Sequence, residues 1–467
     1  MTCAFALSAS EIAQAAHARV TGPADGAAFS SVSTDSRAIR AGDLFVAVRG
    51  PRFDGHAFVG EAVTRGAAGV VVSEAPAGAA VADRVPVFVV IDTIAALQAL
   101  ARHVRERSGA TVVAITGSAG KTTTKEVIAA LVGTRFRTIR NHGNLNNHIG
   151  LPLSLMELTG GAEVAVVEFG MNHAGEISRL VSIATPDVRV WTNVGTAHIE
   201  YFGSMEAIAE AKAEILEGGE GAVLVANADD PLVMAHARRF AGRTLTFGVE
   251  QPAMVRASGI DNRGFDGVTA FVTTPRGSLR LESPLAGRGH LLNVLAAVAV
   301  GVQFDVPLPE VAERVRTLTP APHRGEVLRL SEAVTVVDDC YNASPSALEE
   351  LLRTAAGDRV ERRRVAFLGE MLELGASSER LHRECGAAAA SAGIAALVTV
   401  GGASARALGE AAVAAGLDPA QVAHAASSED AAAMASRVVR PGDLVLVKGS
   451  RGTRMERVVE RLVAEYA

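Results

Sequence analysis

The stretch Thr116-Gly117-Ser118-Ala119-Gly120-Lys121-Thr122 follows the β-branched, apolar run Thr111–Thr116 and precedes a segment with helical periodicity. A strand, a glycine-rich turn and a helix in this order are typical of a phosphate-binding loop. The glycines let backbone N–H groups approach phosphate oxygens, the helix N-terminus adds positive potential, and the lysine reaches the β- and γ-phosphates. The stretch therefore predicts a nucleotide-binding α/β domain.

The predicted loop is shorter than the common one. Only Ser118 and Ala119 separate its first glycine from the Gly-Lys pair, where the common sequence has four residues. This spacing argues against an ordinary GTPase or kinase, and a simple glycine turn without a ligand is the remaining alternative. We expect the Thr122 hydroxyl to bind Mg²⁺. Nucleotide contacts are expected from Gly117, Ser118, Gly120, Lys121, Thr122 and Thr123.

Lysine is rare in this chain. Only Lys121, Lys125, Lys212 and Lys448 occur among 45 basic residues. Arginine replaces lysine on a solvated surface, but it can supply neither a neutral amine nor a compact point charge. The retained lysines are therefore expected at sites that need an amine. Chance retention is the alternative for each, and Lys125, one turn after Lys121, suits an exposed helix face equally well.

Composition excludes several classes of protein. A chain of 467 residues, 49% of them hydrophobic, is long enough for about three domains with large cores. The net charge of −6 and the lack of a long Lys/Arg run give no indication of a nucleic-acid surface. Three scattered cysteines without Cys-x-x-Cys spacing argue against a disulfide framework and a zinc site.

No targeting or membrane segment is predicted. The N-terminal residues lack the positive segment of a secretion signal. The most apolar run, Leu291–Val302, is too short for a bilayer and contains Asn293. We expect a monomer in the reducing cytoplasm that acts on small substrates, without a membrane span and without nucleic acid.

The order of predicted elements indicates an α/β protein of three domains. Residues 1–108 alternate short strands, such as Leu44–Val48 and Gly69–Ser73, with turns, and end in a helix over Thr93–Arg107. The first boundary is placed at Ser108-Gly109. The second is placed at Thr319–Pro322, where proline favours extended structure.

Residues 109–318 and 319–467 both show the strand–helix alternation of a mostly parallel sheet. We interpret the central domain as an ATP-binding phosphate-loop domain and the C-terminal one as a smaller doubly wound, Rossmann-like domain. The predicted strands are Thr111–Thr116, Glu163–Phe169, Val188–Asn193 and Ala222–Ala226 in the central domain, and Val334–Asp338, Arg364–Leu368, Leu397–Val400 and Asp443–Val447 in the C-terminal one.

Two polar residues follow strands of the predicted central sheet. Glu168 ends the run Val164–Val167, and His198 follows the strand at Val188–Asn193. The carboxyl ends of parallel strands are where such sheets hold ligands. Both side chains are therefore candidates for a Mg²⁺ site, the histidine as neutral imidazole, although strand-end carboxylates are often only solvated.

Taken together, the motifs resemble the Mur ligases, the ATP-dependent amide-forming enzymes of peptidoglycan synthesis, over essentially the whole chain. The Asp-Asp-x-Tyr-Asn-Ala and Leu-Gly-x-Met-x-Glu-Leu-Gly runs are similar to those of the family member that adds D-alanyl-D-alanine. The motifs are Thr34–Arg37, Asp54–Phe58, Thr122–Lys125, Asn144–Asn147, Glu168–Asn172, Thr192-Asn193, Ala197-His198, Asp338–Pro345, Leu368–Gly375 and Val447–Gly452.

The resemblance implies a division of labour among the domains: an N-terminal one for the UDP-sugar, a central one for ATP, and a C-terminal one for the incoming amine and part of the ATP. The implied substrates are ATP with Mg²⁺, UDP-N-acetylmuramoyl-tripeptide and D-alanyl-D-alanine. It assigns Glu168 and His198 to Mg²⁺, Asn293 to adenine, and Arg324 and Asp339 to the nucleotide. It assigns Ser36 and Arg37 to the UDP moiety, and we add Asn146, Thr192, Tyr341 and Asn342 as substrate-binding residues.

Lys212 occupies the position where several Mur ligases carry a lysine that CO₂ converts to a carbamate. A carbamate would turn the cation into a carboxylate able to hold a second Mg²⁺ beside His198. We therefore include Lys212 among the expected metal ligands. Two alternatives stay open: a surface lysine between Glu210 and Glu214, and an ammonium that contacts phosphate directly.

Two residues depart from the family pattern. His290 stands where an asparagine is common, and His323 precedes Arg324 where a glycine is common. The expected contacts to adenine and ribose are therefore less well specified than those to phosphate.

The chemistry of amide formation fits the candidate residues. A carboxylate must be activated before an amine can attack it, and ATP can do this through an acyl phosphate once cations offset the accumulated negative charge. Lys121, Glu168, His198 and Lys212 are the expected catalytic residues. Two other interpretations stay open: a sibling amide ligase, such as one resembling folylpolyglutamate synthase, and a nucleotide-switched binding protein without ligase activity.

Overall fold

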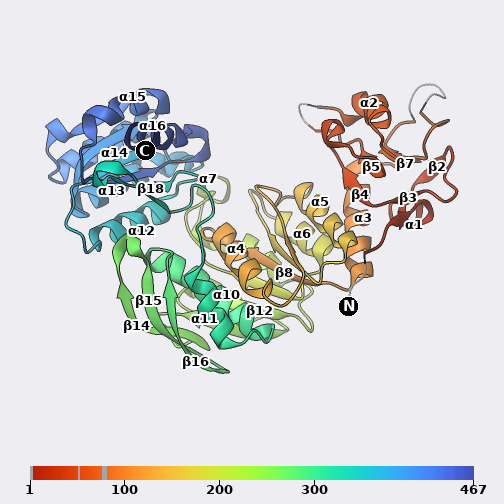
Figure 1. Cartoon of the computed structure of the whole chain (residues 1–467), viewed down its shortest axis with the longest axis horizontal. Helices are drawn as coiled ribbons and strands as arrows, with labels where there is room; N and C mark the ends of the chain where they lie inside the picture. Colours follow the sequence, from red (N-terminus) through yellow and green to blue (C-terminus); the bar gives the residue numbers. More distant parts are fainter. Residues whose placement is uncertain (1–3, 51–52, 76–80) are drawn as a thin grey trace.

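The structure, a computed structural model, describes residues 4–50, 53–75 and 81–467. Figure 1 shows three bodies along an arc, with the first residues at one end, the central ones at the bend and the last ones at the other end. Each body contains its own sheet, with strands drawn from residues 7–89, 111–283 and 326–448. The predicted α/β class with mostly parallel sheets is confirmed.

The N-terminal sheet has the order β2-β7-β6-β5-β4 among the described residues, and β1 pairs separately with β3. Strands β4 to β7 are parallel, and β2 is antiparallel to β7. Their bounds are β1 Leu7–Ser8, β2 Arg19–Thr21, β3 Ala28–Phe29, β4 Ser31–Ser33, β5 Asp43–Val46, β6 Gly69–Val72 and β7 Val87–Val89, with helices α1 Ala9–Ala15, α2 Val59–Thr64 and α3 Thr93–Ser108.

The central sheet has the order β16-β15-β14-β13-β12-β11-β8-β10-β9. Its middle strands are buried at every residue except Thr111, as expected for a parallel sheet covered on both faces. Their bounds are β8 Thr111–Thr116, β9 Thr138–Arg140, β10 Val164–Glu168, β11 Val188–Trp191, β12 Val223–Asn227, β13 Arg243–Gly248, β14 Val255–Asn262, β15 Val268–Thr274 and β16 Gly277–Ser283.

Residues 243–283 extend this sheet beyond the strands that the sequence predicts. Strands β14, β15 and β16 pair antiparallel to one another, and the residues of β15 and β16 mostly alternate between buried and more exposed positions. This alternation is typical of a sheet covered on one face only. The central sheet is therefore mixed, with a parallel half that carries the predicted loop and an antiparallel half that extends away from it (Figure 1).

Helices cover both faces of the central sheet. The apolar run Leu291–Val302 lies in α10, which packs on α4 and is buried almost throughout. No helix among residues 4–50, 53–75 and 81–467 has the length and apolar character needed to cross a membrane. The helix bounds are α4 Lys121–Val132, α5 Gly150–Met156, α6 Glu176–Ala184, α7 Ile199–Phe202, α8 Met205–Ala213, α9 Pro231–Ala237, α10 Gly287–Gln303 and α11 Leu308–Arg316.

The C-terminal sheet has the order β17-β18-β22-β19-β20-β21 and is parallel except for β17. Helices lie on both of its faces, which agrees with the predicted doubly wound arrangement. The bounds are β17 Glu326–Arg329, β18 Thr335–Asp339, β19 Arg364–Gly369, β20 Ile394–Val400, β21 Val422–Ala425 and β22 Leu444–Lys448, with α12 Pro345–Ala356, α13 Ser378–Ser391, α14 Ala403–Ala414, α15 Ser428–Val438 and α16 Glu456–Tyr466.

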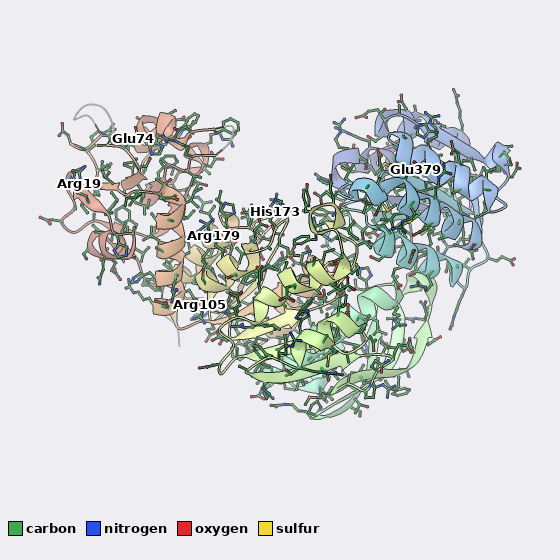
Figure 2. All side chains as sticks on the ribbon, turned by 180° about the vertical axis from the view of Figure 1, so that it is seen from behind. Arg19, Glu74, Arg105, His173, Arg179 and Glu379 are labelled. Atoms are coloured by element: carbon green, nitrogen blue, oxygen red, sulfur yellow. The ribbon has the colours of Figure 1, made fainter. Side chains whose placement is uncertain are left out.

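Helix α3 links the first two bodies. The sequence places it at the end of the N-terminal domain, yet it packs on α5 and α6 of the central domain. Arg105, near its C-terminal end, is buried and donates to the carbonyls of Ala184 and Thr185 and, at 2.7 Å, to the carboxylate of Asp187. Figure 2 shows Arg105 where this helix meets the central domain. The contacts of α3 with the central domain therefore help to fix the orientation of the N-terminal body.

We predict that Arg105→Ala destabilises the central domain by about 2–3 kcal/mol, because two carbonyls and a carboxylate lose a buried partner. Arg102→Ala on the same helix is the matched control, since its pair with Glu106 is exposed and worth less than about 1 kcal/mol. Trp191, the single tryptophan, is buried in β11, so its fluorescence in urea reports this domain. Equal midpoints for both variants would contradict the role given to Arg105.

Candidate active site

Two positions in the loop before α4, Gly117 and Gly120, require glycine. Gly117 has φ +153°, and a Cβ there would lie 1.9 Å from Oγ1 of Thr192. Gly120 has φ +80°, and a Cβ there would lie 2.2 Å from Oδ1 of Asn293. Both positions therefore combine a backbone conformation that glycine favours with a close neighbour.

The segment that follows β11 holds the loop in place. The N–H of Ser118 donates to the Asn193 carbonyl at 3.1 Å, and the N–H of Ala119 donates to Oδ1 of Asn193 at 2.9 Å. The Thr192 hydroxyl donates to the Ala119 carbonyl at 2.8 Å. Helix α4 begins directly after this turn and has no side-chain cap. Its first-turn N–H groups have no partner within the helix, which favours an anion at this end.

Glu168 lies at the end of β10 and is 4% exposed. One carboxylate oxygen accepts from the Thr122 hydroxyl at 2.7 Å, and the other accepts from Nδ2 of Asn146 at 2.9 Å. Burial raises the pKa of this carboxyl, but the Lys121 ammonium and these two hydrogen bonds outweigh it, so the pKa lies below its ordinary value. Glu168 is therefore a carboxylate at neutral pH.

None of the four lysines lies on an exposed surface. Lys121 donates to the Gly117 carbonyl at 2.8 Å, and burial lowers its pKa against the opposing charge of Glu168. Lys125 is 1% exposed and donates to the Asn141 carbonyl at 2.6 Å, so the exposed-helix alternative for it is wrong. Lys448, also buried, pairs with Asp339 at 2.5 Å.

Lys212, near the end of α8, is 1% exposed, so the surface alternative for it is wrong. No described carboxylate pairs with its ammonium within 4.0 Å, although Glu210 and Glu214 are close in sequence. Burial, with the positive charge of Lys121 in addition, lowers its pKa well below the ordinary value. Both effects disfavour the protonated form of the amine.

His198 joins the same region from the loop after β11. It takes the left-handed conformation, with φ +66°, and its Nδ1 lies 2.6 Å from a carboxylate oxygen of Glu373 in the C-terminal domain. Burial and the charge of Lys121 lower its pKa, although Glu373 opposes them. The imidazole is therefore held in its neutral form, as a metal ligand requires.

The C-terminal domain supplies the facing wall. The Arg324 guanidinium stacks on the Tyr341 ring, 4.0 Å from its centre, and Lys448 fixes Asp339 and also donates to the Asn342 carbonyl at 3.2 Å. His323, one of the two departures from the family pattern, pairs with Asp338 at 2.7 Å.

Both domains enclose a cavity of about 960 Å³. Its position between α4 and the ends of β10, β11 and β18 agrees with the rule that parallel sheets bind ligands at their carboxyl ends. The predicted residues that line it are Ser118, Gly120, Lys121, Thr122, Thr123, Asn146, Glu168, His198, Asn293, Arg324, Asp339, Tyr341 and Asn342.

Five predicted residues do not line the cavity. Gly117 and Thr192 lie beneath the loop and shape it. Lys212 is buried near Lys121, whose charge acts on it. Ser36 and Arg37 lie in the N-terminal domain, where Ser36 is buried near Glu61 and Arg37 pairs with Asp35.

Two cavity residues, Asn193 and Lys448, and one residue outside the cavity, Glu373, have roles that the sequence did not assign, although each lies within a motif that it singled out. Asn193 holds the loop, Lys448 fixes Asp339, and Glu373 contacts His198. The scarcity of lysine was a usable signal for Lys448. The roles of Asn193 and Glu373 depend on contacts across strands or domains, which spacing in sequence does not reveal.

The chain matches three sequence profiles in order: the Mur ligase family, catalytic domain, at residues 28–105, the Mur ligase middle domain at residues 115–301, and the Mur ligase, glutamate ligase domain, at residues 323–451. It is 34% identical to UDP-N-acetylmuramoyl-tripeptide–D-alanyl-D-alanine ligase of Bacillus subtilis (strain 168), over 92% of this chain and 93% of that protein.

Two solved structures share the whole architecture. MurF from Acinetobacter baumannii superposes with a TM-score of 0.88 at 29% identity, over 99% of both chains. The MurF ligase from Thermotoga maritima, solved in complex with ADP, superposes with a TM-score of 0.80 at 32% identity, over 93% of this chain and 97% of that one. With profile, sequence and fold in agreement along nearly its full length, the chain belongs to the Mur ligase family.

Proposed function

We propose that the chain is an ATP-dependent ligase that joins the terminal carboxylate of UDP-N-acetylmuramoyl-tripeptide to the amine of D-alanyl-D-alanine and releases ADP and phosphate. The observation that carries the proposal is the cavity in which the phosphate loop faces Asp339 and Tyr341 of the C-terminal domain. The activity named for the Bacillus subtilis relative supports the choice of substrates. One chain supplies every wall of this cavity, which favours a monomer, and we place the enzyme in the cytoplasm.

The phosphates of ATP would lie at the N-terminus of α4. There the unpaired N–H groups and Lys121 offset their charge, while Asn293, which accepts from the Thr124 hydroxyl at 3.2 Å, faces the base. Arg324 and Asp339 would contact the same nucleotide from the opposite wall. ATP is thus held by two domains, which is a common way to couple binding to closure.

The polar groups beside the loop fit Mg²⁺. Thr122 and Glu168 present oxygen atoms within 2.7 Å of each other, which is the donor type that this ion prefers. His198 lies on the wall of the same cavity, and Lys212 would contribute a carboxylate if CO₂ modified it. When bound, Mg²⁺ would offset the negative charge that accumulates between the γ-phosphate and the substrate carboxylate.

Two displacement steps account for the reaction. A carboxylate oxygen of the tripeptide attacks the γ-phosphorus, the bond from that phosphorus to the β–γ bridging oxygen breaks, and ADP leaves. The amine of D-alanyl-D-alanine then attacks the acyl carbon, loses a proton, and inorganic phosphate leaves. Lys121 orients and neutralises the phosphoryl group in the first step. No side-chain nucleophile of the protein is needed.

The UDP moiety would bind to the N-terminal domain, near Ser36 and Arg37. Asn172 and Glu176 line one side of the cavity, and His173 and Arg179 lie on the surface of the central domain between the two outer domains (Figure 2). A tripeptide that crosses this surface would carry its terminal carboxylate to the phosphate loop.

The assay that separates the candidate functions is phosphate release with each substrate omitted in turn. We expect release only when ATP, UDP-N-acetylmuramoyl-tripeptide and D-alanyl-D-alanine are all present, because the acyl phosphate is consumed only by the amine. Release with a single amino acid in place of D-alanyl-D-alanine would favour a sibling ligase. Slow release that ignores both substrates would favour a nucleotide-switched binding protein.

We predict that Lys121→Ala lowers kcat at least 1,000-fold, since loss of a buried phosphate-contacting charge costs roughly 4 kcal/mol or more in the transition state. Calorimetric titration with UDP-N-acetylmuramoyl-tripeptide should give nearly unchanged affinity, because Ser36 and Arg37 lie in another domain. Unchanged Trp191 fluorescence controls for folding. A large drop in that affinity would contradict the assignment of the UDP moiety to the N-terminal domain.

We predict that Lys212→Ala loses activity and recovers part of it in acetate or formate, because a small carboxylate replaces the carbamate. The activity of the native enzyme should fall as the pH is lowered, because protonation of the Lys212 amine prevents its reaction with CO₂. The pKa of Lys212 lies well below that of an ordinary lysine, so this loss of activity should occur at a lower pH than it would for an ordinary lysine. Glu206→Ala, exposed on the same helix, is the matched control and should not respond to acetate. Rescue by small amines alone would show that Lys212 acts as a cation.

A further inference from the structure

Three side chains of the C-terminal domain, those of His323, Asp338 and Cys340, meet beside the cavity. One donor atom from each lies within 4.8 Å of the other two. None of the three residues lines the cavity itself. Their donor atoms are a ring nitrogen, a carboxylate oxygen and a sulfur, all of which bind metal ions in proteins. The group is therefore a possible metal site apart from Thr122 and Glu168.

The end of β18 brings these side chains together. Side chains alternate along a strand, so Asp338 and Cys340 point to one side of the sheet, whereas Asp339 between them lines the cavity. Asp338 is 2% exposed and Cys340 is 0% exposed. His323 reaches them from the turn before β17, and its Nδ1 lies 2.7 Å from a carboxylate oxygen of Asp338. The His323 side chain is 37% exposed, which gives an ion access from solvent.

The backbone of this turn does not require a histidine. His323 has φ +60°, a conformation that glycine adopts freely and that costs another residue roughly 1 kcal/mol. The same turn is tied to β18 through the backbone. The N–H of Tyr341 donates to the His323 carbonyl at 3.0 Å, and the N–H of Gly325 donates to the Asp338 carbonyl at 2.9 Å. These two bonds hold the segments together whatever the side chain at position 323.

The surroundings of the sulfur favour a cation. Burial raises the pKa of the Cys340 thiol, and the carboxylates of Asp338, Glu456 and Asp339 raise it further. One oxygen of Glu456 lies 3.4 Å from Arg451, but the other, Oε2, is buried and has no hydrogen-bond partner among the described residues. A field that holds a proton on sulfur also attracts a divalent cation. Such an ion binds the sulfur in place of the proton, which passes to water.

The donor set selects the kind of ion. Zn²⁺ accepts sulfur, nitrogen and oxygen ligands at about 2.0–2.3 Å, whereas Mg²⁺ prefers oxygen alone. Tetrahedral geometry with these bonds separates the donor atoms by roughly 3.3–3.6 Å. The observed arrangement is close to this, with 2.7 Å between imidazole and carboxylate and at most 4.8 Å between any two donors. Three protein ligands leave the fourth position open to water.

We propose that His323, Asp338 and Cys340 form a binding site for Zn²⁺ or a similar borderline-soft divalent cation, separate from the Mg²⁺ site at the phosphate loop. The spacing of the cysteines argues against a zinc site built from cysteine pairs, but this site needs only one cysteine. Binding of the ion involves no turnover, so it can be measured whether or not the chain is a ligase.

The first experiment uses Co²⁺ in place of Zn²⁺, with the full chain in excess Mg²⁺ and without nucleotide. We expect a thiolate-to-Co²⁺ charge-transfer band in the native protein and its loss in Cys340→Ser. Cys385→Ala is the matched control and should keep the band, because Cys385 is buried in α13 of the same domain, outside the group. A native protein without the band, or a band that persists in Cys340→Ser, would overturn the proposal.

The second experiment measures Zn²⁺ affinity by competition with a chromogenic chelator. We expect His323→Gly to weaken binding at least about tenfold, since even residues that only orient metal ligands contribute this much. Glycine accepts φ +60° without strain, so this variant tests the proposal even if Cys340→Ser folds poorly. His17→Gly is the matched control, because His17 is exposed, has φ +51° and belongs to the N-terminal domain. Equal Zn²⁺ affinity in His323→Gly and His17→Gly would show that the imidazole is not a ligand and refute the site.

Discussion

The centre of the molecule depends on one buried carboxylate, that of Glu168. It receives hydrogen bonds from Thr122 of the loop helix and from Asn146 of a separate segment, and Lys121 supplies the opposing charge. Burying a carboxylate is costly unless hydrogen bonds and a counter-charge offset the loss of water. The start of α4 and the segment that contains Asn146 are therefore fixed relative to β10 by the need to neutralise this carboxylate.

The remaining charges around this carboxylate are mostly positive or able to become so. Lys121 and Arg324 act on the charge of Glu168, and Lys121 also acts on His198 and Lys212, although the whole chain carries a net charge of −6. Burial first, and then nearby positive charge, lower the pKa values of Lys121, Lys212 and His198, although Glu168 opposes this at Lys121 and Glu373 at His198. Such a site is unfavourable when empty and becomes favourable when phosphates and a substrate carboxylate enter it.

Domain contact is the second constraint on the site. The phosphate loop is complete within the central domain, because Asn193 and Thr192 hold it from below. The opposite wall, with Arg324, Asp339 and Lys448, belongs to the C-terminal sheet. An enzyme that must exclude water from an acyl phosphate benefits from this division, since closure can follow binding.

The sequence by itself determined the loop, its strand and helix, and most of the predicted residues that line the cavity, because these features depend on local spacing and on residue types with few substitutes. Lys121, Thr122 and Glu168 were identifiable for this reason, and the scarcity of lysine indicated Lys212 and Lys448. The motifs also predicted the family, and the comparisons confirmed it.

Tertiary structure alone decided the rest. The strands β14 to β16 carry no recognisable motif. They form by antiparallel pairing with one another at the edge of the central sheet. Helix α3 packs on α5 and α6, although the sequence places it in the first domain. The pairs of Asn193 with the loop and of Glu373 with His198 join residues 74 and 175 positions apart. Such contacts arise from packing between elements, and the periodicity of one segment holds no information about its partner.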